Sequence, residues 1–323
     1  MISDWVGRSL AVAAGFGVDR VFGEPPVRIH PVVGFGWLMK RVEALVYADT
    51  RVAGTAICAF GSGAGFGVGI LGTRLFGSRA ATALAVASAL AGKMLADEAM
   101  HVNSALDCQD LPMARARVIS LVGRSTSDLN EAELSRAVIE SLAENTVDAV
   151  IASLFWASIG GAPAVLAHRA INTLDAMVGH HSPRYENFGW ASARLDDVVN
   201  WIPSRVAAIA VAVVKPAQAK AIWGVVRRDA RQHPSPNGGV IEAAFAGALG
   251  IRLGGTNRYG DQVEERGVLG DGRVAEVADI DRAVTLSRNI GLLCALILPL
   301  LASYASLALP GSLQGRKLLW RAA

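Results

Sequence analysis

Two long runs without charge constrain the fold of this chain more than any other feature of its sequence. Residues 52–73 and residues 289–315 contain no Asp, Glu, Lys or Arg. A transmembrane helix needs about 20 predominantly apolar residues, so each run is long enough to cross a bilayer. The composition agrees, because 52% of the residues are hydrophobic and only 18% are charged, whereas an ordinary soluble domain carries more charge.

Two weaker apolar segments and three polar blocks complete the outline. Residues 5–22 and 80–96 are interrupted by charged side chains, and polar residues dominate 97–148, 169–205 and 227–288. Such polar blocks favour loops and extramembrane helices that carry the chemistry. We therefore predict an all-α protein, a polytopic membrane bundle of helices. Its predicted organisation is a single domain over 1–323, with mainly membrane helices over 1–96, site-bearing polar segments with short apolar hairpins over 97–288, and a C-terminal membrane helix over 289–310.

The glycines of residues 61–72 favour close helix packing over nucleotide binding. Residues 67–72 formally match the dinucleotide fingerprint Gly-x-Gly-x-x-Gly. That fingerprint needs a preceding strand and a following acidic partner at a set distance, and we predict neither here. Small residues four apart are typical of membrane helices whose backbones approach closely. We therefore predict that this segment is a helix-packing surface.

The pattern Asn-Thr-x-Asp-Ala occurs twice, at residues 145–149 and 172–176. Residues three apart lie on one face of a helix, so each copy presents an amide beside a carboxylate at the edge of an apolar segment. Oxygen ligands of this kind suit Mg²⁺ or a polar substrate. The repeat therefore predicts a polar site at a membrane edge.

The stretch between the two copies decides whether they can meet. Residues 149–168 are uncharged and are long enough for a single span, which would place the copies on opposite sides of the membrane. However, residues 160–163 read Gly-Gly-Ala-Pro, a helix breaker that leaves two arms of about ten residues, roughly 15 Å each. We favour a re-entrant or interfacial hairpin, which brings both copies together beside Asp196 and Asp197.

An acidic row leads into the first copy of the repeat. Glu140, Glu144 and Asp148 follow one another at the four-residue spacing of one helix face. A solvated helix face is the alternative interpretation of this row. A bound cation would remove the repulsion between neighbouring carboxylates.

Further polar groups suit phosphate and metal chemistry. Asp196 and Asn200 share a helical face next to Asp197, an arrangement that suits Mg²⁺ held against phosphates. Residues 233–239, His-Pro-Ser-Pro-Asn-Gly-Gly, form either a phosphate nest or a plain loop. His30 lies at another membrane edge. Arginines flank the acidic motifs and are either guanidinium forks for phosphate or carboxylate oxygens or ordinary juxtamembrane residues: Arg124, Arg169 and Arg205.

The charge balance excludes one class of partner. The formal net charge is +3, and the basic residues are dispersed along the chain. Nucleic-acid binding leaves a clustered basic footprint, so we expect no nucleic-acid partner. The lipid bilayer is the expected neighbour of the apolar segments.

Together these segments resemble the cobalamin-biosynthesis family of adenosylcobinamide-phosphate synthases, CobD/CbiB. The resemblance covers nearly the whole chain and rests on residues 19–25, 30–32, 123–126, 140–148, 188–203, 235–237 and 246–255. It implies an integral enzyme of the cell (inner) membrane with its site on the cytoplasmic side. The implied reaction is an ATP-dependent ligase reaction that joins aminopropanol, usually as its phosphate, to a propionate carboxylate of the corrinoid adenosylcobyric acid. The product is adenosylcobinamide or its phosphate, and the expected course is through an acyl phosphate, with Mg²⁺ as cofactor.

The candidate site residues take roles in that chemistry. Those assigned to catalysis are Glu140, Glu144, Asp148, Asp196, Asp197 and His233, and the same set without His233 is assigned to Mg²⁺. Those assigned to substrate or phosphate binding are His30, Arg124, Ser125, Asn145, Arg169, Asn172, Asp175, Tyr185, Asn200, Arg205, Ser235 and Asn237.

Two other functions are compatible with parts of the sequence. A Mg²⁺-dependent intramembrane prenyl-type transferase would use two Asp-rich helical motifs to bind a diphosphate, and it would turn over without ATP. A membrane sensor or transporter would need no enzyme site, but it gives no reason for so many carboxylates and amides outside the bilayer core. The sequence leaves the oligomeric state open, a homo-oligomer included.

Overall fold

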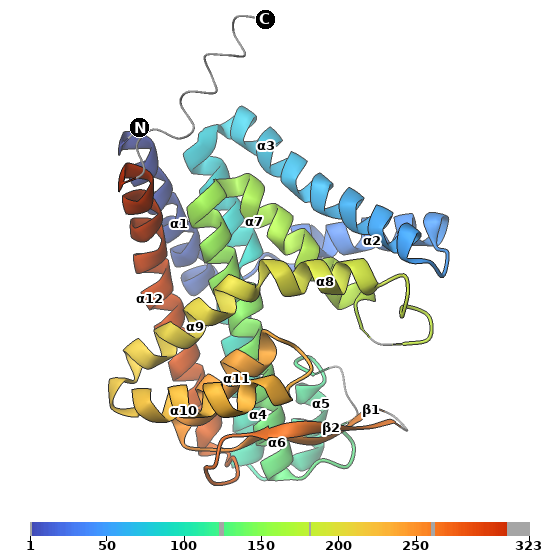
Figure 1. The fold of residues 1–323 in the computed structure, drawn as a ribbon, viewed down its shortest axis with the longest axis vertical. Helices are drawn as coiled ribbons and strands as arrows, with labels where there is room; N and C mark the ends of the chain where they lie inside the picture. Colours follow the sequence, from blue (N-terminus) through green and yellow to red (C-terminus); the bar gives the residue numbers. More distant parts are fainter. Residues whose placement is uncertain (1, 123–125, 181, 260–261, 309–323) are drawn as a thin grey trace, which may run out of the picture.

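A computed structural model of the protein describes residues 2–122, 126–180, 182–259 and 262–308. Nearly all of this is helix, as Figure 1 shows. The α-helices are α1 (Ile2–Phe22), α2 (Pro31–Val46), α3 (Arg51–Ala89), α4 (Gly92–Asp107), α5 (Leu111–Val118), α6 (Glu131–Thr146), α7 (Ala152–Val178), α8 (Trp190–Val199), α9 (Trp201–Val214), α10 (Ala219–Asp229), α11 (Gly238–Leu249) and α12 (Ala278–Ala308). The remaining elements are the 3₁₀ turns η1 (Val27–Ile29), η3 (Pro216–Gln218) and η4 (Ala230–Gln232), the π-helical turn η2 (Val147–Ile151), and the strands β1 (Leu253–Tyr259) and β2 (Gln262–Leu269).

The long apolar helices confirm the predicted all-α membrane bundle. Three helical segments are long and apolar enough to cross a membrane, namely Arg51–Asp107, Glu131–Val178 and Ala278–Ala305. A fourth candidate is the bent pair Trp190–Val199 and Trp201–Val214, whose helices differ in direction by 43°. The predicted run 52–73 lies within the first segment, and the third segment covers residues 289–305 of the run 289–315. Residues 309–315 lie outside the described residues.

The weaker predicted candidates behave differently. α1 covers residues 5–22, but it is not among the apolar spans of the described chain because charged residues interrupt it. Residues 80–96 are broken between Ala89 and Gly92, where the chain leaves α3 and enters α4. At this break the backbone N–H of Ala91 donates to the carbonyl of Ala149, at 3.3 Å.

Large apolar side chains are exposed on the helices at one end of the molecule. Figure 1 shows α1, α3, α7 and the C-terminal half of α12 at the upper end, and α4 to α6, α10, α11 and the strands at the lower end. Soluble proteins rarely expose large contiguous apolar surfaces, so the upper end is suited to lipid. The exposed side chains include Phe60, Phe66, Leu71 and Leu75 on α3, and Leu292, Leu296, Leu300 and Leu301 on α12.

The glycines of α3 form the predicted packing surface. Gly61, Gly65 and Gly69, each four residues after the last, are buried against α7. A Cβ at Gly65 would lie 2.6 Å from the carbonyl oxygen of Leu166, and one at Gly69 would collide with the backbone of Pro163. At Gly65 and Gly69 the backbone of α7 occupies the space that a side chain would need, and at Gly61 the side chain of Leu174 on α7 occupies it.

The predicted break in α7 is present at Gly161, whose backbone has φ 63° and ψ −150°. A kink leaves backbone groups of both arms without helical partners. Arg8 of α1 donates to the carbonyl of Ile159 at 2.7 Å, and Thr82 Oγ1 of α3 accepts from the N–H of Ala162 at 3.2 Å. The two neighbouring helices therefore support the bend from both sides.

The last polar block contains an antiparallel hairpin of β1 and β2, where the sequence predicted loops. A bulge lies between Gly254 and Gly255, whose φ values are 76° and 89°. Such glycine-dependent bulges obscure the alternating pattern by which strands are recognised. The hairpin is joined to α6, because the N–H of Gly254 donates to Glu140 Oε1 at 2.8 Å.

A buried carboxylate, that of Asp229, connects the β1–β2 hairpin to α10. Asp229, at the end of α10, accepts two hydrogen bonds from the guanidinium of Arg228, both at 2.7 Å, and one from the N–H of Gly270 at 2.9 Å. These bonds hold the pKa of Asp229 below its usual value, with the Arg228 contribution the largest, although burial opposes them. The site thus joins α10 to the end of β2.

We expect Asp229→Asn to lower the free energy of unfolding by about 2 kcal/mol, because hydrogen bonds to a charged group are lost. A carboxylate with a lowered pKa stabilises the fold above its unfolded pKa of about 4 and loses that effect as pH falls. The gap between wild type and variant should therefore narrow below that pH. Thermal unfolding in detergent at several pH values measures it, and a gap that widens in acid would contradict the assignment.

Candidate functional site

The first repeated motif lies at a change of helix type. α6 ends at Thr146, and Asp148 is part of the π-helical turn η2 before α7 begins. π-helical turns occur frequently at functional sites. Asp148 is half-buried and interacts electrostatically with three other carboxylates, and its own carboxylate is hydrogen-bonded by the side chain of Asn172. Those carboxylates belong to Asp196, Glu144 and Asp175.

The break in α7 therefore brings both copies of the repeat together, as the hairpin hypothesis predicts. Asn172 of the second copy accepts from Arg169 at 3.1 Å and donates to Asp196 at 3.4 Å. Asn200 donates to the other oxygen of Asp196 at 3.0 Å and is hydrogen-bonded to buried His168 at 2.9 Å. The resulting network positions the Asp196 carboxylate from α7 and from the end of α8. We call Glu144, Asp148, Asp175 and Asp196 the carboxylate cluster.

The two copies differ in their local roles. The amide of Asn145 donates to the backbone carbonyl of Ser141 at 2.9 Å and to its hydroxyl at 3.2 Å, within its own helix. Asn172, by contrast, connects different helices. The repeated sequence thus produces one helix-bound amide and one amide that crosslinks the carboxylate cluster.

The loop before α11 is held next to this cluster by polar contacts. Ser235 Oγ accepts from the N–H groups of Asn237 and Gly238 at 3.2 and 3.0 Å. The amide of Asn237 donates to the carbonyl of Asp197 at 2.9 Å and accepts from Arg205 at 2.9 Å. Ser235 and Asn237 therefore shape this loop and attach it to α8 and α9.

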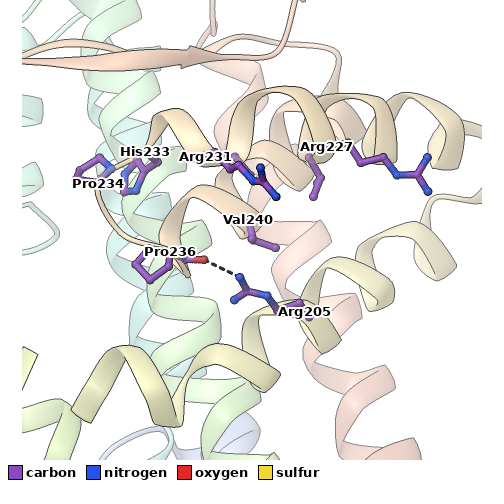
Figure 2. A pocket seen from close by; sticks show the side chains of 9 residues that line it. Arg205, Arg227, Arg231, His233, Pro234, Pro236 and Val240 are labelled. Carbon is purple, nitrogen blue, oxygen red and sulfur yellow. Dashed lines mark hydrogen bonds between the residues drawn. The ribbon is translucent and has the colours of Figure 1, made fainter. Parts of the chain in front are cut away.

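A pocket of ≈ 540 Å³ lies on the other side of this loop. Figure 2 shows Arg205 facing it from α9, and Arg227 and Arg231 on the opposite wall, with His233 nearby. Arg205 donates to the carbonyl of Pro236 at 3.1 Å. Among the described residues, no ion pair involves Arg227 or Arg231. We call Arg205, Arg227, Arg231 and His233 the arginine pocket, which is suited to an anionic ligand.

Glu144 links the two regions. Its Oε1 lies 4.0 Å from His233 Nε2, while its charge acts on Asp148. Glu144 therefore lies between the carboxylate cluster and the arginine pocket and interacts with a residue of each.

Several predicted residues lie apart from these two regions. Glu140 is engaged by the Gly254 N–H and lies 3.7 Å from Arg136. Tyr185 donates to Glu43 of α2 at 2.9 Å. His30 caps α2 by accepting from the N–H of Val32. Arg124 and Ser125 lie outside the described residues.

Three residues of the site were missed in the sequence. Arg227 and Arg231 looked like dispersed surface charges, and only folding places them at the wall of a pocket. Glu242 carried a signal, because it is the only Asp, Glu, Lys or Arg between Arg231 and Arg252. A lone carboxylate in so apolar a segment indicates a specific partner.

The carboxylate cluster offers the type of donor that a hard divalent cation prefers, although its oxygens are not gathered as closely as the ligand atoms of Glu144, His233 and Glu242. Its carboxylates come from four elements, α6, η2, α7 and α8. The described cations near it are Arg169, which acts on Asp148, and Arg194, 3.8 Å from neighbouring Asp197. Mg²⁺ is usually held by one or two carboxylates together with substrate phosphates. An anion in the adjacent arginine pocket would complete such a set.

Comparisons with known proteins agree on one family. A family model described as CobD/Cbib protein matches residues 12–287. The chain is 47% identical over 297 residues to the cobalamin biosynthesis protein CobD of Mycobacterium tuberculosis (strain ATCC 25618 / H37Rv), covering 89% of this chain and 94% of that protein. It is 41% identical over 269 residues to the same-named protein of Pelobacter propionicus, covering 79% and 82%, and 38% identical over 300 residues to that of Rhodobacter capsulatus, covering 86% and 92%. No solved structure matches the chain.

Proposed function

The chain belongs to the CobD/CbiB protein family, and on that premise we propose that it is a membrane enzyme of cobalamin biosynthesis. The proposed reaction is ATP-dependent amide formation between aminopropanol or its phosphate and a propionate carboxylate of adenosylcobyric acid. The observation that carries the proposal is that the carboxylate cluster and the arginine pocket are neighbours, joined at Glu144. Phosphoryl transfer to a carboxylate needs both a cation site and an anion site.

The proposed reaction has two steps, phosphorylation of the carboxylate and attack by the amine. A carboxylate is a poor acyl donor, so its oxygen first takes the γ-phosphoryl group of ATP and ADP leaves. The neutral amine then attacks the acyl carbon, inorganic phosphate leaves, and the amine loses one proton. Glu144, Asp148 and Asp196, together with substrate phosphates, would hold Mg²⁺, which would supply charge neutralisation when bound.

The residues of this chain divide the remaining tasks. Arg205, Arg227 and Arg231 bind phosphate oxygens, because guanidinium forks match their geometry. We assign the proton of the amine to Asp148, whose carboxylate is surrounded by those of Glu144, Asp175 and Asp196. Asn172 and Asn200 position Asp196. ATP and the corrinoid reach the site from the cytoplasm.

The proposal is tested with purified protein in nanodiscs supplied with adenosylcobyric acid, ATP, Mg²⁺ and aminopropanol phosphate. We expect a product that contains the new amide, together with one ADP for each amide. An assay with free aminopropanol identifies the preferred amine. Amide formation without ATP, or no amide under any of these conditions, would overturn the proposal.

The arginine pocket supports a second, quantitative test. Arg231→Ala is expected to raise the KM for ATP or for aminopropanol phosphate about tenfold or more, because a charge-assisted hydrogen bond to phosphate is lost. Lys220→Ala is the matched control, since Lys220 is exposed on the adjoining helix α10 but does not line the pocket. Equal KM values in wild type and Arg231→Ala for both substrates would exclude phosphate binding by this residue.

A further inference from the structure

Among the described residues, one group of histidine and carboxylate side chains converges closely enough to hold a metal ion. It consists of Glu144, His233 and Glu242, whose potential ligand atoms all lie within 4.8 Å of one another. His233 Nε2 is 3.2 Å from Glu242 Oε1 and 4.0 Å from Glu144 Oε1. Donors around a tetrahedral ion at about 2.1 Å are separated by roughly 3.4 Å, and the two distances bracket this value.

The burial of Glu242 sets this group apart from an ordinary ion pair at a surface. Its residue is 1% exposed, and every other residue of α11 is buried as well. Removing a carboxylate from water costs several kcal/mol unless its charge is compensated. His233 is also buried, so the compensation takes place in a site from which water is largely excluded.

The surrounding backbone makes room for the third ligand. A Cβ at Gly238 would lie 2.6 Å from Glu144 Oε1 and 3.0 Å from His233 Cε1. Glycine at the start of α11 therefore permits Glu144 of α6 to approach the imidazole. An alanine at this position would push the two ligands apart.

The imidazole is oriented from its other side. His233 Nδ1 accepts from the backbone N–H of Ser235 at 3.1 Å, and the carbonyl oxygen of Ser235 lies 3.3 Å from the same ring atom. Metal-binding histidines commonly donate their second ring N–H to a backbone carbonyl. Without a metal, the Ser235 N–H donates to Nδ1, and Nε2–H can donate to Glu242 at 3.2 Å. Metal binding selects the other tautomer, in which Nδ1–H donates to the Ser235 carbonyl and the Nε2 lone pair faces the two carboxylates.

We propose that Glu144, His233 and Glu242 bind one divalent transition-metal ion, Zn²⁺ or Mn²⁺, through one imidazole nitrogen and two carboxylates. This site is distinct from the Mg²⁺ cluster of the proposed function, although both use Glu144. Imidazole suits these ions, whereas Mg²⁺ demands oxygen ligands and keeps several waters. Three protein ligands leave a coordination position open, as in catalytic sites. His233 also lines the arginine pocket, so a ligand in that pocket lies close to the ion.

The test uses the full chain in nanodiscs after treatment with a chelator. Equilibrium dialysis with Zn²⁺ alone, read by elemental analysis, and with Mn²⁺ alone, read by electron paramagnetic resonance, is expected to show one ion per chain at this site. A hundredfold excess of Mg²⁺ should not displace it. Glu242→Gln and His233→Ala should each weaken binding at least about 100-fold, because each removes one of three protein ligands.

Two further variants keep the test decisive. Glu144→Gln changes a side chain that is 36% exposed, so it should fold even if a change at Glu242 does not, and it should also weaken binding. Glu131→Gln, an exposed position on the same helix α6, is the control that should leave binding unchanged. No bound Zn²⁺ or Mn²⁺ in wild type, or equal binding in wild type and Glu144→Gln, would overturn the proposal. Because the readout is metal binding, it is independent of amide-forming activity.

Discussion

Replacing Asp148 by asparagine is expected to lower ATP-dependent corrinoid amidation by about 100-fold or more, the range in which loss of a positioned acid or base falls. Asparagine keeps the size of the side chain and its contact with Asn172, but it cannot accept a proton or hold a cation by charge. The carboxylate sits in the π-helical turn η2, where the charges of Glu144, Asp175 and Asp196 act on it. The predicted loss therefore falls on kcat and on the Mg²⁺ dependence.

The same substitution is expected to leave stability unchanged or to raise it. Four carboxylates that repel one another destabilise the fold in the absence of a cation, and such strain at active sites is commonly relieved by inactivating substitutions. Thermal unfolding without added metal measures this effect alongside the amidation assay. Loss of activity together with a lowered Tm would point to a structural role for Asp148 instead.

Asp281→Asn provides the matched control for this experiment. Asp281 is exposed near the start of α12, and its side chain has no hydrogen bond or ion pair to any residue that the structure describes. Its replacement removes one carboxylate without touching the cluster. Full activity of Asp281→Asn and Asp148→Asn alike, with the same Mg²⁺ requirement, would remove Asp148 from the mechanism.

Replacing Gly69 by valine is expected to destabilise the protein by about 3 kcal/mol or more, because the new side chain collides with backbone that cannot move aside. Its Cβ alone would overlap Pro163, which starts the second arm of α7 and is rigid. Separating α3 from α7 would also displace the arm that carries Asn172 and Asp175. Activity should therefore fall together with Tm.

Gly67→Val tests whether this effect comes from packing or from the loss of glycine. Gly67 lies half a turn away on the same helix and is exposed, and a Cβ there meets no other atom within 4 Å. The Gly67 variant should keep the wild-type Tm in detergent. If the two variants unfold at the same temperature, the contact between α3 and α7 does not set the stability of the bundle.

The sequence was most informative where apolar residues repeat over long distances. The uncharged runs, the four-residue spacing of the α3 glycines and the breaker before Pro163 predicted the membrane helices, their packing and the bend of α7. Each is a local pattern that acts through backbone geometry or transfer from water, so it can be read without knowing the partners. The sequence did not predict the β1–β2 hairpin, because its glycine bulge interrupts the alternation of polar and apolar residues that is typical of strands.

The site was only partly readable for a related reason. Asp148, Asp175 and Asp196 were expected together because the bend in α7 implies it, and the structure places their charges within reach of one another. Glu140 belongs to the same helical row as Glu144, yet its carboxylate bonds the Gly254 N–H instead. Arg231 could not be told from an ordinary surface charge in the sequence, and Glu242 had no recognisable partner. Both were therefore missed.

The sequence by itself therefore determined the membrane bundle, the bend in α7 and which carboxylates lie near the two ends of that bent helix. Only the tertiary structure decided which carboxylate faces which partner. The β1–β2 hairpin binds Glu140 through the N–H of Gly254. The loop before α11 places His233 beside Glu144 and Glu242. Helical periodicity determines the direction in which a side chain leaves its own helix. The group that it contacts belongs to another element: residues 233 and 254 lie more than 80 residues along the chain from Glu144 and Glu140.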